Sequence, residues 1–326
     1  MNEERTALLG EKKELFRNDK GWEGNLVEGV SMIKKGEYYY AFYAGAGCCG
    51  SGCDYQTGIA RSKTLLGPWE KYDKNPVLTN DNEWKCPGHG TPVEKDGKYY
   101  FLYHAYDKET DVYTGREGLL IEFRFTPDGW IEFVKKEENN DVAVTSLTDD
   151  FNGKVLANHW QWSVFQPAVY KQKRRRLQLA ATPSPSGAYL GTKTTSGTYT
   201  ATVEVQTKRT NAIAGLGIIG DDKNTVSVIL DGNVLKVQQL KDGKDSVYHQ
   251  QPIDSRKKLY LQVQVTGGRN ASFLYSNDGN TFQPLNATPV DGRFLPPWDR
   301  SLRIGLISKG EATQKAIFDN FRIINK

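Results

Sequence analysis

Two segments of this chain share one pattern, and each begins with a side chain that can do chemistry. The first runs from Glu28 to Tyr43, and the second, from His89 to Tyr103, begins 61 residues later. Both read as two short strands around a Gly-containing turn, with aromatic residues in the second strand. A fixed repeat of this kind is typical of a radially repeated all-β architecture such as a propeller. We therefore expect Glu28 and His89 at equivalent places, on the innermost strand of each unit.

A carboxyl group in the position of Glu28 can act as a general acid. Inverting glycosidases need one protonated carboxyl that gives its proton to the leaving oxygen, and one ionised carboxylate about 6.5–9.5 Å away that activates water. The apolar, aromatic strand that follows Glu28 favours the uncharged form of such a group. The ordinary alternative is an exposed carboxylate at a strand end with no catalytic role.

The motifs around Glu28 resemble the second half of the catalytic domain of glycoside hydrolase family 43, over about residues 15–140. They stand in the family's order: Val27-Glu28-Gly29, Gly58-Ile59-Ala60-Arg61-Ser62, Gly67-Pro68-Trp69-Glu70, Pro87-Gly88-His89-Gly90 and Gly115-Arg116-Glu117. The resemblance implies a five-bladed β-propeller that hydrolyses arabinose- and xylose-containing plant polysaccharides with inversion. It also implies that Glu28 is the general acid.

The same resemblance suggests roles for four further residues. An equivalent of His89 lies in many relatives near a bound calcium ion, so His89 is a candidate cation ligand or sugar contact, with a hydrogen-bonded core histidine as the alternative. Arg116 matches the family arginine that hydrogen-bonds the sugar beside the acid, a task that suits a guanidinium group. Trp84 and Tyr106 are candidates for stacking on a sugar ring, with ordinary packing as the alternative.

The chain departs from the family in what precedes Glu28. In the family, the general base and the Asp that orients the acid come from blades upstream of the acid, whereas 27 residues precede Glu28 here. Asp54, Asp107 and Asp111 all follow Glu28, so we carry neither role over to them. We expect a fragment of a family 43 enzyme that lacks the general base, and a second chain could complete the propeller.

A β-sandwich is predicted over residues 147–326, after a partial five-bladed propeller over residues 1–146. Alternating segments with turns every 8–12 residues indicate two packed sheets. This region resembles the concanavalin-like jelly roll that follows the propeller in many family 43 β-xylosidases. Asp150 near the first strand and Asp319 on the last could together bind a structural calcium ion, although carboxylates in turns are ordinary. The expected fold class is therefore all-β throughout.

Four cysteines lie in the expected propeller fragment, at Cys48, Cys49, Cys53 and Cys86. Two disulfides that brace a loop would fit an exported protein. Free structural thiols and a metal site are the alternatives. The sequence does not give the connectivity.

Composition agrees with a β-rich protein and argues against two kinds of partner. The 326 residues include 32 Gly, 17 Tyr and 13 Phe but only 2 Met, a profile of strands and tight turns. A net charge of +4 argues against nucleic acid, and the run 173–176 reads as a solvated basic turn. No apolar stretch is long enough to span a membrane. The first residues lack the apolar core of a signal peptide, but relatives are commonly exported, so we expect a periplasmic or secreted parent protein.

Two functions remain open from the sequence. The first is an inverting glycosidase of the β-xylosidase or α-L-arabinofuranosidase type, acting on xylo- or arabino-oligosaccharides and needing no cofactor for its chemistry. The second is a noncatalytic carbohydrate-binding sandwich with a vestigial half propeller. Loss of hydrolysis, but not of sugar binding, on replacing Glu28 by Gln would separate them.

Overall fold

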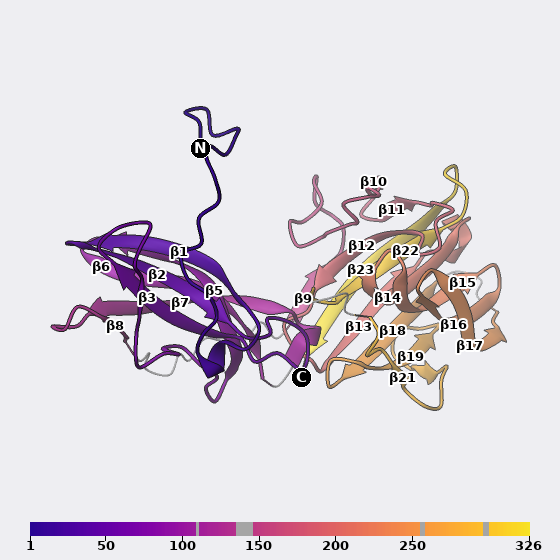
Figure 1. Ribbon diagram of the computed structural model, residues 1–326. Coiled ribbons are helices and arrows are strands. Elements are labelled where there is room, and N and C mark those ends of the chain that lie inside the picture. Colours follow the sequence, from indigo (N-terminus) through magenta and orange to yellow (C-terminus); the bar gives the residue numbers. More distant parts are fainter. Residues whose placement is uncertain (109–110, 135–145, 255–257, 296–299) are drawn as a thin grey trace. The chain divides into compact units, whose positions relative to one another are not determined.

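The computed structural model describes residues 1–108, 111–134, 146–254, 258–295 and 300–326. The chain forms two compact units: Met1–Lys108 with Glu117–Asn139, and Glu109–Arg116 with Asn140–Lys326 (Figure 1). The described residues are strands and loops apart from three short 3-10 helices: η1 (Gly21–Glu23), η2 (Asp111–Tyr113) and η3 (Thr207–Arg209). Within these ranges, no helix is long and apolar enough to cross a membrane.

The first unit contains two four-stranded antiparallel sheets, each an up-and-down meander of the kind that forms a propeller blade. Each sheet follows the chain order, and the first strands of the two sheets, β1 and β5, contact each other. The strands are β1 (Val27–Lys35), β2 (Tyr38–Gly45), β3 (Gln56–Ser62) and β4 (Glu70–Lys71), then β5 (Trp84–Lys95), β6 (Lys98–Asp107), β7 (Arg116–Phe125) and β8 (Ile131–Phe133).

Aromatic side chains fill the space between these two sheets. Phe42 of β2 stacks on Phe101 of β6 with ring centroids 4.9 Å apart, and Phe123 of β7 lies 5.2 Å from Phe42. All three are fully buried. Strands alternate their side chains between two faces, so the aromatic residues that mark the sequence repeat become the packing layer between two neighbouring blades.

The strand register corrects the spacing of the repeat by one residue. Matching pairs lie 60 residues apart: Glu28 with Ala44 and Gly88 with His104, Ser31 with Phe42 and Thr91 with Leu102, Lys35 with Tyr38 and Lys95 with Lys98. Glu28 is thus equivalent to Gly88, and His89 to Gly29, so the predicted equivalence of Glu28 and His89 is wrong. The sequence match had superposed the turn glycines Gly36 and Gly97, which occupy the first and second places of their two-residue turns, where a positive φ is needed.

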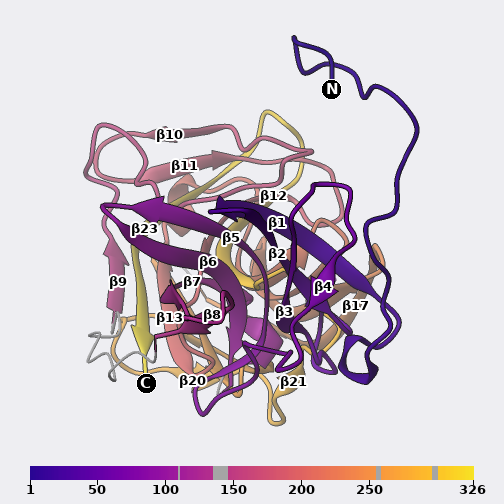
Figure 2. The same ribbon diagram turned by 60° about the vertical axis from the view of Figure 1, so that its left-hand side comes forward.

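The second unit is a sandwich of a nine-stranded and a six-stranded antiparallel sheet (Figure 2). The larger sheet has the order β10-β11-β23-β13-β18-β19-β20, with β9 also on β23 and β21 also on β19. Its strands are β9 (Ser146–Asp149), β10 (Tyr170–Gln172), β11 (Leu177–Ala180), β13 (Tyr199–Val205), β18 (Leu259–Thr266), β19 (Asn270–Ser276), β20 (Gln283–Pro284), β21 (Val290–Asp291) and β23 (Lys315–Asn325).

The smaller sheet has the order β12-β22-β14-β15-β16-β17. Its strands are β12 (Ala188–Lys193), β14 (Ile213–Asp221), β15 (Asn224–Asp231), β16 (Val234–Lys241), β17 (Lys244–Pro252) and β22 (Arg303–Lys309). Alternate residues of both sheets form one buried apolar core, among them Val203, Leu261, Phe273, Leu216, Val228 and Leu306. Both units therefore confirm the predicted all-β class, with a partial propeller followed by a sandwich.

Candidate active site

Glu28 is the second residue of β1 and is half-buried. The Tyr55 hydroxyl donates a hydrogen bond to Glu28 Oε1 over 2.9 Å. Directly after Glu28 the register with β2 slips by one residue, and Gly29 takes a positive φ of 61°. A bulge of this kind re-aims the side chains beside it, so the strand itself sets the direction of the Glu28 carboxyl.

His89 lies directly beside this bulge. A Cβ atom at Gly29 would stand only 2.9 Å from Cγ of His89, so the imidazole occupies the space that any side chain at position 29 would need. The His89 ring is exposed, and its centroid lies 6.0 Å from that of His104. The structure therefore brings Glu28 and His89 together, through packing of one strand on the other.

Tyr55 and His104 belong to the same cluster, and the sequence analysis missed both. Their rings are stacked, with centroids 6.1 Å apart and an interplanar angle of 8°. A Cβ atom at Gly88 would lie 2.4 Å from the Tyr55 ring, so this glycine leaves room for the tyrosine. Counting register along β1, β2 and β3 would have indicated Tyr55, because Glu28, Ala44 and Thr57 lie in one row of the sheet.

The loop between β2 and β3 is fastened at several points. Cys53 forms a disulfide with Cys86, whose Cα lies 6.1 Å away, and the neighbours Cys48 and Cys49 form the second disulfide. The Gly47 amide donates to Asp54 Oδ1 over 2.6 Å. Of the three states that the sequence left open for the cysteines, the structure adopts the disulfides.

The two candidates for sugar stacking differ in exposure. Tyr106 is fully buried, and its hydroxyl accepts a hydrogen bond from the Gly50 amide at 3.4 Å. Its ring therefore has no free face for a sugar in this structure. Trp84 is half-buried at the start of β5 and stays a candidate.

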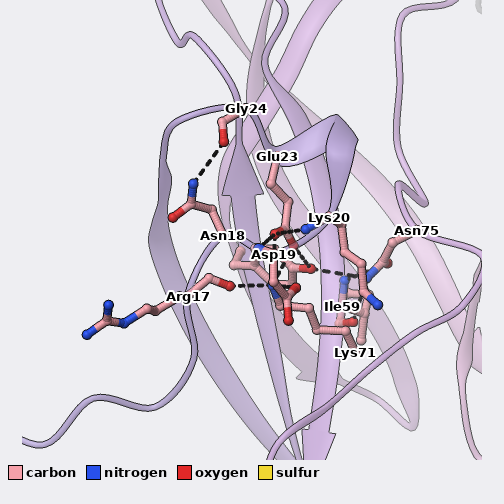
Figure 3. Close-up of polar contacts among 10 residues, drawn as sticks. Arg17, Asn18, Asp19, Lys20, Glu23, Gly24, Ile59, Lys71 and Asn75 are labelled. Atoms are coloured by element: carbon pink, nitrogen blue, oxygen red, sulfur yellow. Dashed lines mark hydrogen bonds and ion pairs between the residues drawn. The ribbon is translucent and has the colours of Figure 1, made fainter.

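Glu23, five residues before Glu28, is the most heavily hydrogen-bonded carboxylate of the first unit (Figure 3). It has no exposed surface. The Tyr43 hydroxyl donates to Oε1 over 2.7 Å, and Lys71 Nζ donates to Oε2 over 2.8 Å. Backbone amides of Asp19 and Lys20 also donate to Oε2, over 2.8 and 3.0 Å. Burial alone would raise the pKa of Glu23, but these donors outweigh it and hold the pKa below its ordinary value.

This network fixes the turn from which β1 starts. Trp22 of the same turn fits against Gly45 and Gly58, where Cβ atoms would lie 2.8 and 2.7 Å from the indole. The Ala46 amide donates to the Glu23 carbonyl over 2.8 Å. Glu23 therefore holds the approach to Glu28 against β2 and β3, a role that no sequence motif had indicated.

The residues predicted to bind calcium lie in different surroundings. Asp150 Oδ2 is 3.9 Å from an Arg175 nitrogen, and Asp319 Oδ2 is 3.6 Å from Arg176 Nε. Burial and the nearby Glu204 raise the pKa of Asp319. Across the described ranges, no group of three or more His, Cys, Asp or Glu side chains is placed to hold a metal ion. A calcium role for His89, Asp150 or Asp319 stays a prediction.

Arg116 is the first residue of β7 and is half-buried. It belongs to the stretch Glu109–Arg116 of the second unit, whereas Glu28 belongs to the first. The predicted contact of Arg116 with a sugar stays a prediction.

Comparisons with known proteins agree with these two units. Residues 1–131 match the model of glycosyl hydrolases family 43, and residues 148–323 match that of the beta-xylosidase C-terminal concanavalin A-like domain. A non-reducing end α-L-arabinofuranosidase of Bacteroides ovatus is 27% identical over 64% of this chain and 44% of its own length. An extracellular exo-α-(1→5)-L-arabinofuranosidase of Cellvibrio japonicus is 29% identical over 36% of each chain. The chain thus spans less than half the length of these curated relatives.

Solved structures show the same fold. A variant of the family 43 protein BlXynB from Bacillus licheniformis superposes with a TM-score of 0.79 at 23% identity, covering 100% of this chain and 70% of that one. A xylan β-1,4-xylosidase from Bacillus halodurans superposes with a TM-score of 0.75 at 20% identity, covering 97% and 68%. With both domain models matched in the family's order, the chain belongs to glycosyl hydrolase family 43 and carries the concanavalin A-like domain of its β-xylosidases.

Proposed function

We propose that this chain is the acid-bearing part of an inverting glycosidase that removes arabinofuranosyl or xylosyl units from plant oligosaccharides. The observation that carries the proposal is Glu28, half-buried on a bulged strand between Tyr55 and His89. The printed activities of the relatives, arabinofuranosidases and xylosidases, support the class of sugar.

The hydrogen bond from Tyr55 assigns the two oxygens of Glu28 to different tasks. Oε1 accepts the Tyr55 proton, so we assign Oε2 to hold the catalytic proton. In the reaction, Oε2–H protonates the leaving oxygen as the glycosidic bond breaks, and a carboxylate on the opposite face of the sugar takes a proton from the attacking water. Tyr55 is then a positioning residue for the acid.

We assign that second carboxylate to another chain that completes the propeller. The β5–β8 sheet supports this, because its face away from Phe101 carries three exposed apolar side chains. Val93, Leu102 and Leu120 are 47%, 53% and 55% exposed. Apolar residues gathered on one sheet face are typical of an interaction surface, and in a propeller such a face packs on the next blade.

Export is also part of the proposal. Disulfides form in oxidising compartments, and all four cysteines are paired. The relative from Cellvibrio japonicus is named as extracellular. Secreted protein should therefore contain no titratable thiol after denaturation without reductant, and four free thiols would contradict export.

The test is hydrolysis of aryl β-xylosides and aryl α-arabinofuranosides by the chain, Glu28→Gln and Tyr55→Phe, over a range of protein concentrations. Glu28→Gln should lower kcat by about 10²–10⁴-fold for aryl groups that leave only when protonated, and far less for nitrophenols that leave unaided. Tyr55→Phe should cost on the order of tenfold, because one oriented hydrogen bond is lost.

The concentration series separates the remaining readings. Specific activity that rises with protein concentration, or on adding an N-terminal half of a family 43 propeller, would support assembly. Turnover that Glu28→Gln leaves unchanged would contradict the assigned acid. Sugar binding without turnover under every condition would favour the noncatalytic alternative.

A further inference from the structure

The sandwich carries a basic hollow of about 370 Å³ on its larger sheet. Positive side chains dominate its lining, which contains no acidic residue and no aromatic residue: Lys173, Arg174, Arg176, Gln178, Arg209, Lys315 and Ile317. Five of these seven residues carry a positive charge. The volume is within the range typical of small-molecule sites, about 300–1,000 Å³.

Strand register explains why these side chains meet. β11 and β23 are antiparallel neighbours in which Gln178 pairs with Ile317. Leu177 and Leu179 point into the core, so the residues that alternate with them, Arg176 and Gln178, point the other way. By the same alternation Lys315 and Ile317 share this outer face of the sheet.

The helix η3 supplies the opposite wall of the hollow. The Gln206 amide donates to the Ile317 carbonyl over 2.9 Å, and the Ile317 amide donates to Thr210 Oγ1 over 3.0 Å. The Asn211 amide donates to the Lys315 carbonyl over 3.1 Å. These bonds on both sides of η3 (Thr207–Arg209) fasten it along β23 and place Arg209 across from the β10–β11 turn.

Arg176 has hydrogen-bonding capacity to spare. Its side chain is 25% exposed, and the nearest carboxylate, Asp319, is 3.6 Å from Nε, too far for a good hydrogen bond. Nε is buried, and it has no hydrogen-bond partner in the part of the chain that the structure describes. A buried donor of this kind is costly to leave unsatisfied, so an anion in the hollow would be stabilised.

We propose that this basic hollow binds a carboxylate-bearing sugar, the uronate unit of an acidic oligosaccharide. Planar guanidinium groups recognise carboxylates with two parallel hydrogen bonds, and the apolar Ile317 at the base can contact the C–H face of a sugar ring. Single-stranded nucleic acid is disfavoured, because the lining offers no aromatic ring on which bases could stack. The site lies in the second unit, so it is distinct from Glu28 and goes beyond the proposed hydrolysis.

The test is calorimetric titration of the whole chain with trigalacturonate, with xylotriose as the neutral probe. Trigalacturonate should bind at least about tenfold more tightly than xylotriose, and its affinity should fall as salt is raised. The double variant Arg209→Gln/Lys315→Gln should lose at least about tenfold in affinity for trigalacturonate. Both positions are exposed, and thermal unfolding would verify that the fold is kept.

The matched control is Arg175→Gln/Lys208→Gln, which makes the same change in net charge. Both residues are exposed neighbours of the lining residues but do not line the hollow. Affinity should stay within about twofold of the parent chain, as expected for surface charges that act only through a screened field. Equal losses in both double variants would overturn the site in favour of a general positive field.

Two further probes can overturn the choice of ligand. Inorganic phosphate that binds as tightly as trigalacturonate would show a plain anion site with no preference for sugar. Oligodeoxythymidine that binds more tightly than trigalacturonate, and loses affinity in Arg209→Gln/Lys315→Gln, would make nucleic acid the occupant. Neither binding measurement depends on whether the chain hydrolyses glycosides.

Discussion

Two glutamates five residues apart have opposite surroundings. Glu23 is fully buried and accepts hydrogen bonds from Lys71, Tyr43 and two backbone amides. Glu28 is half-buried and accepts one hydrogen bond from Tyr55. A carboxylate with all its acceptor sites filled by donors is a structural group, whereas one with an oxygen to spare can take part in proton transfer.

Replacing Glu23 by Gln should destabilise the first unit by about 2–3 kcal/mol at neutral pH, because charge-assisted hydrogen bonds are lost inside the protein. Urea unfolding of the parent chain and the variant measures this difference. Glu14→Gln is the control, since Glu14 pairs with Arg17 on the surface, with both side chains more than half exposed. An unchanged free energy of unfolding in Glu23→Gln would contradict the structural role of this carboxylate.

The same pair of proteins should show a defined pH dependence. The pKa of Glu23 lies below its ordinary value of 4.5 in the folded state, so its stabilising contribution is complete above that value. The contribution is lost as the pH falls through the folded-state pKa, where the carboxylate becomes protonated. The stability difference between the two proteins should therefore be constant above about pH 5 and shrink in more acidic solution.

At the scale of elements, the loop between β2 and β3 shows how far sequence reasoning reaches. Alternation, Gly turns and the aromatic repeat indicate strands, and the structure confirms them. Partners such as Tyr55 for Glu28, or Lys71 for Glu23, depend on register between strands that are 27 to 48 residues apart. A slip of one residue reverses the faces of a strand, which is why the repeat was placed at 61 and not 60.

The two disulfides of this loop should differ in their effect on stability. Cys53 and Cys86 are 33 positions apart, so their bond restricts the unfolded chain and should contribute about 3–4 kcal/mol. Cys48 and Cys49 are adjacent, so their bond closes almost no chain. Denaturant unfolding should show a large loss for Cys53→Ser/Cys86→Ser and little change for Cys48→Ser/Cys49→Ser. Equal losses in the two double variants would contradict this account.

At the scale of the whole molecule, the exposed face of the β5–β8 sheet should drive association. Sedimentation analysis should find assemblies whose fraction rises with concentration, because apolar faces and open sheet edges promote pairing between chains. Leu102→Glu/Leu120→Glu should shift the chain to monomer. The control Leu65→Glu/Leu66→Glu changes two leucines of similar exposure, 51% and 61%, in the β3–β4 connection. Monomer at every concentration in the parent chain would contradict a propeller completed by association.

During synthesis, the larger sheet of the sandwich cannot close until its middle strand exists. β23 (Lys315–Asn325) pairs with β9, β11 and β13, all of which leave the ribosome long before it. At about 5–20 residues per second, the ribosome needs on the order of 10 seconds to pass from the end of β13 to the end of β23. Throughout that interval β11 and β13 have open edges, so translation speed over residues 206–325 sets how long the nascent sandwich is exposed to aggregation.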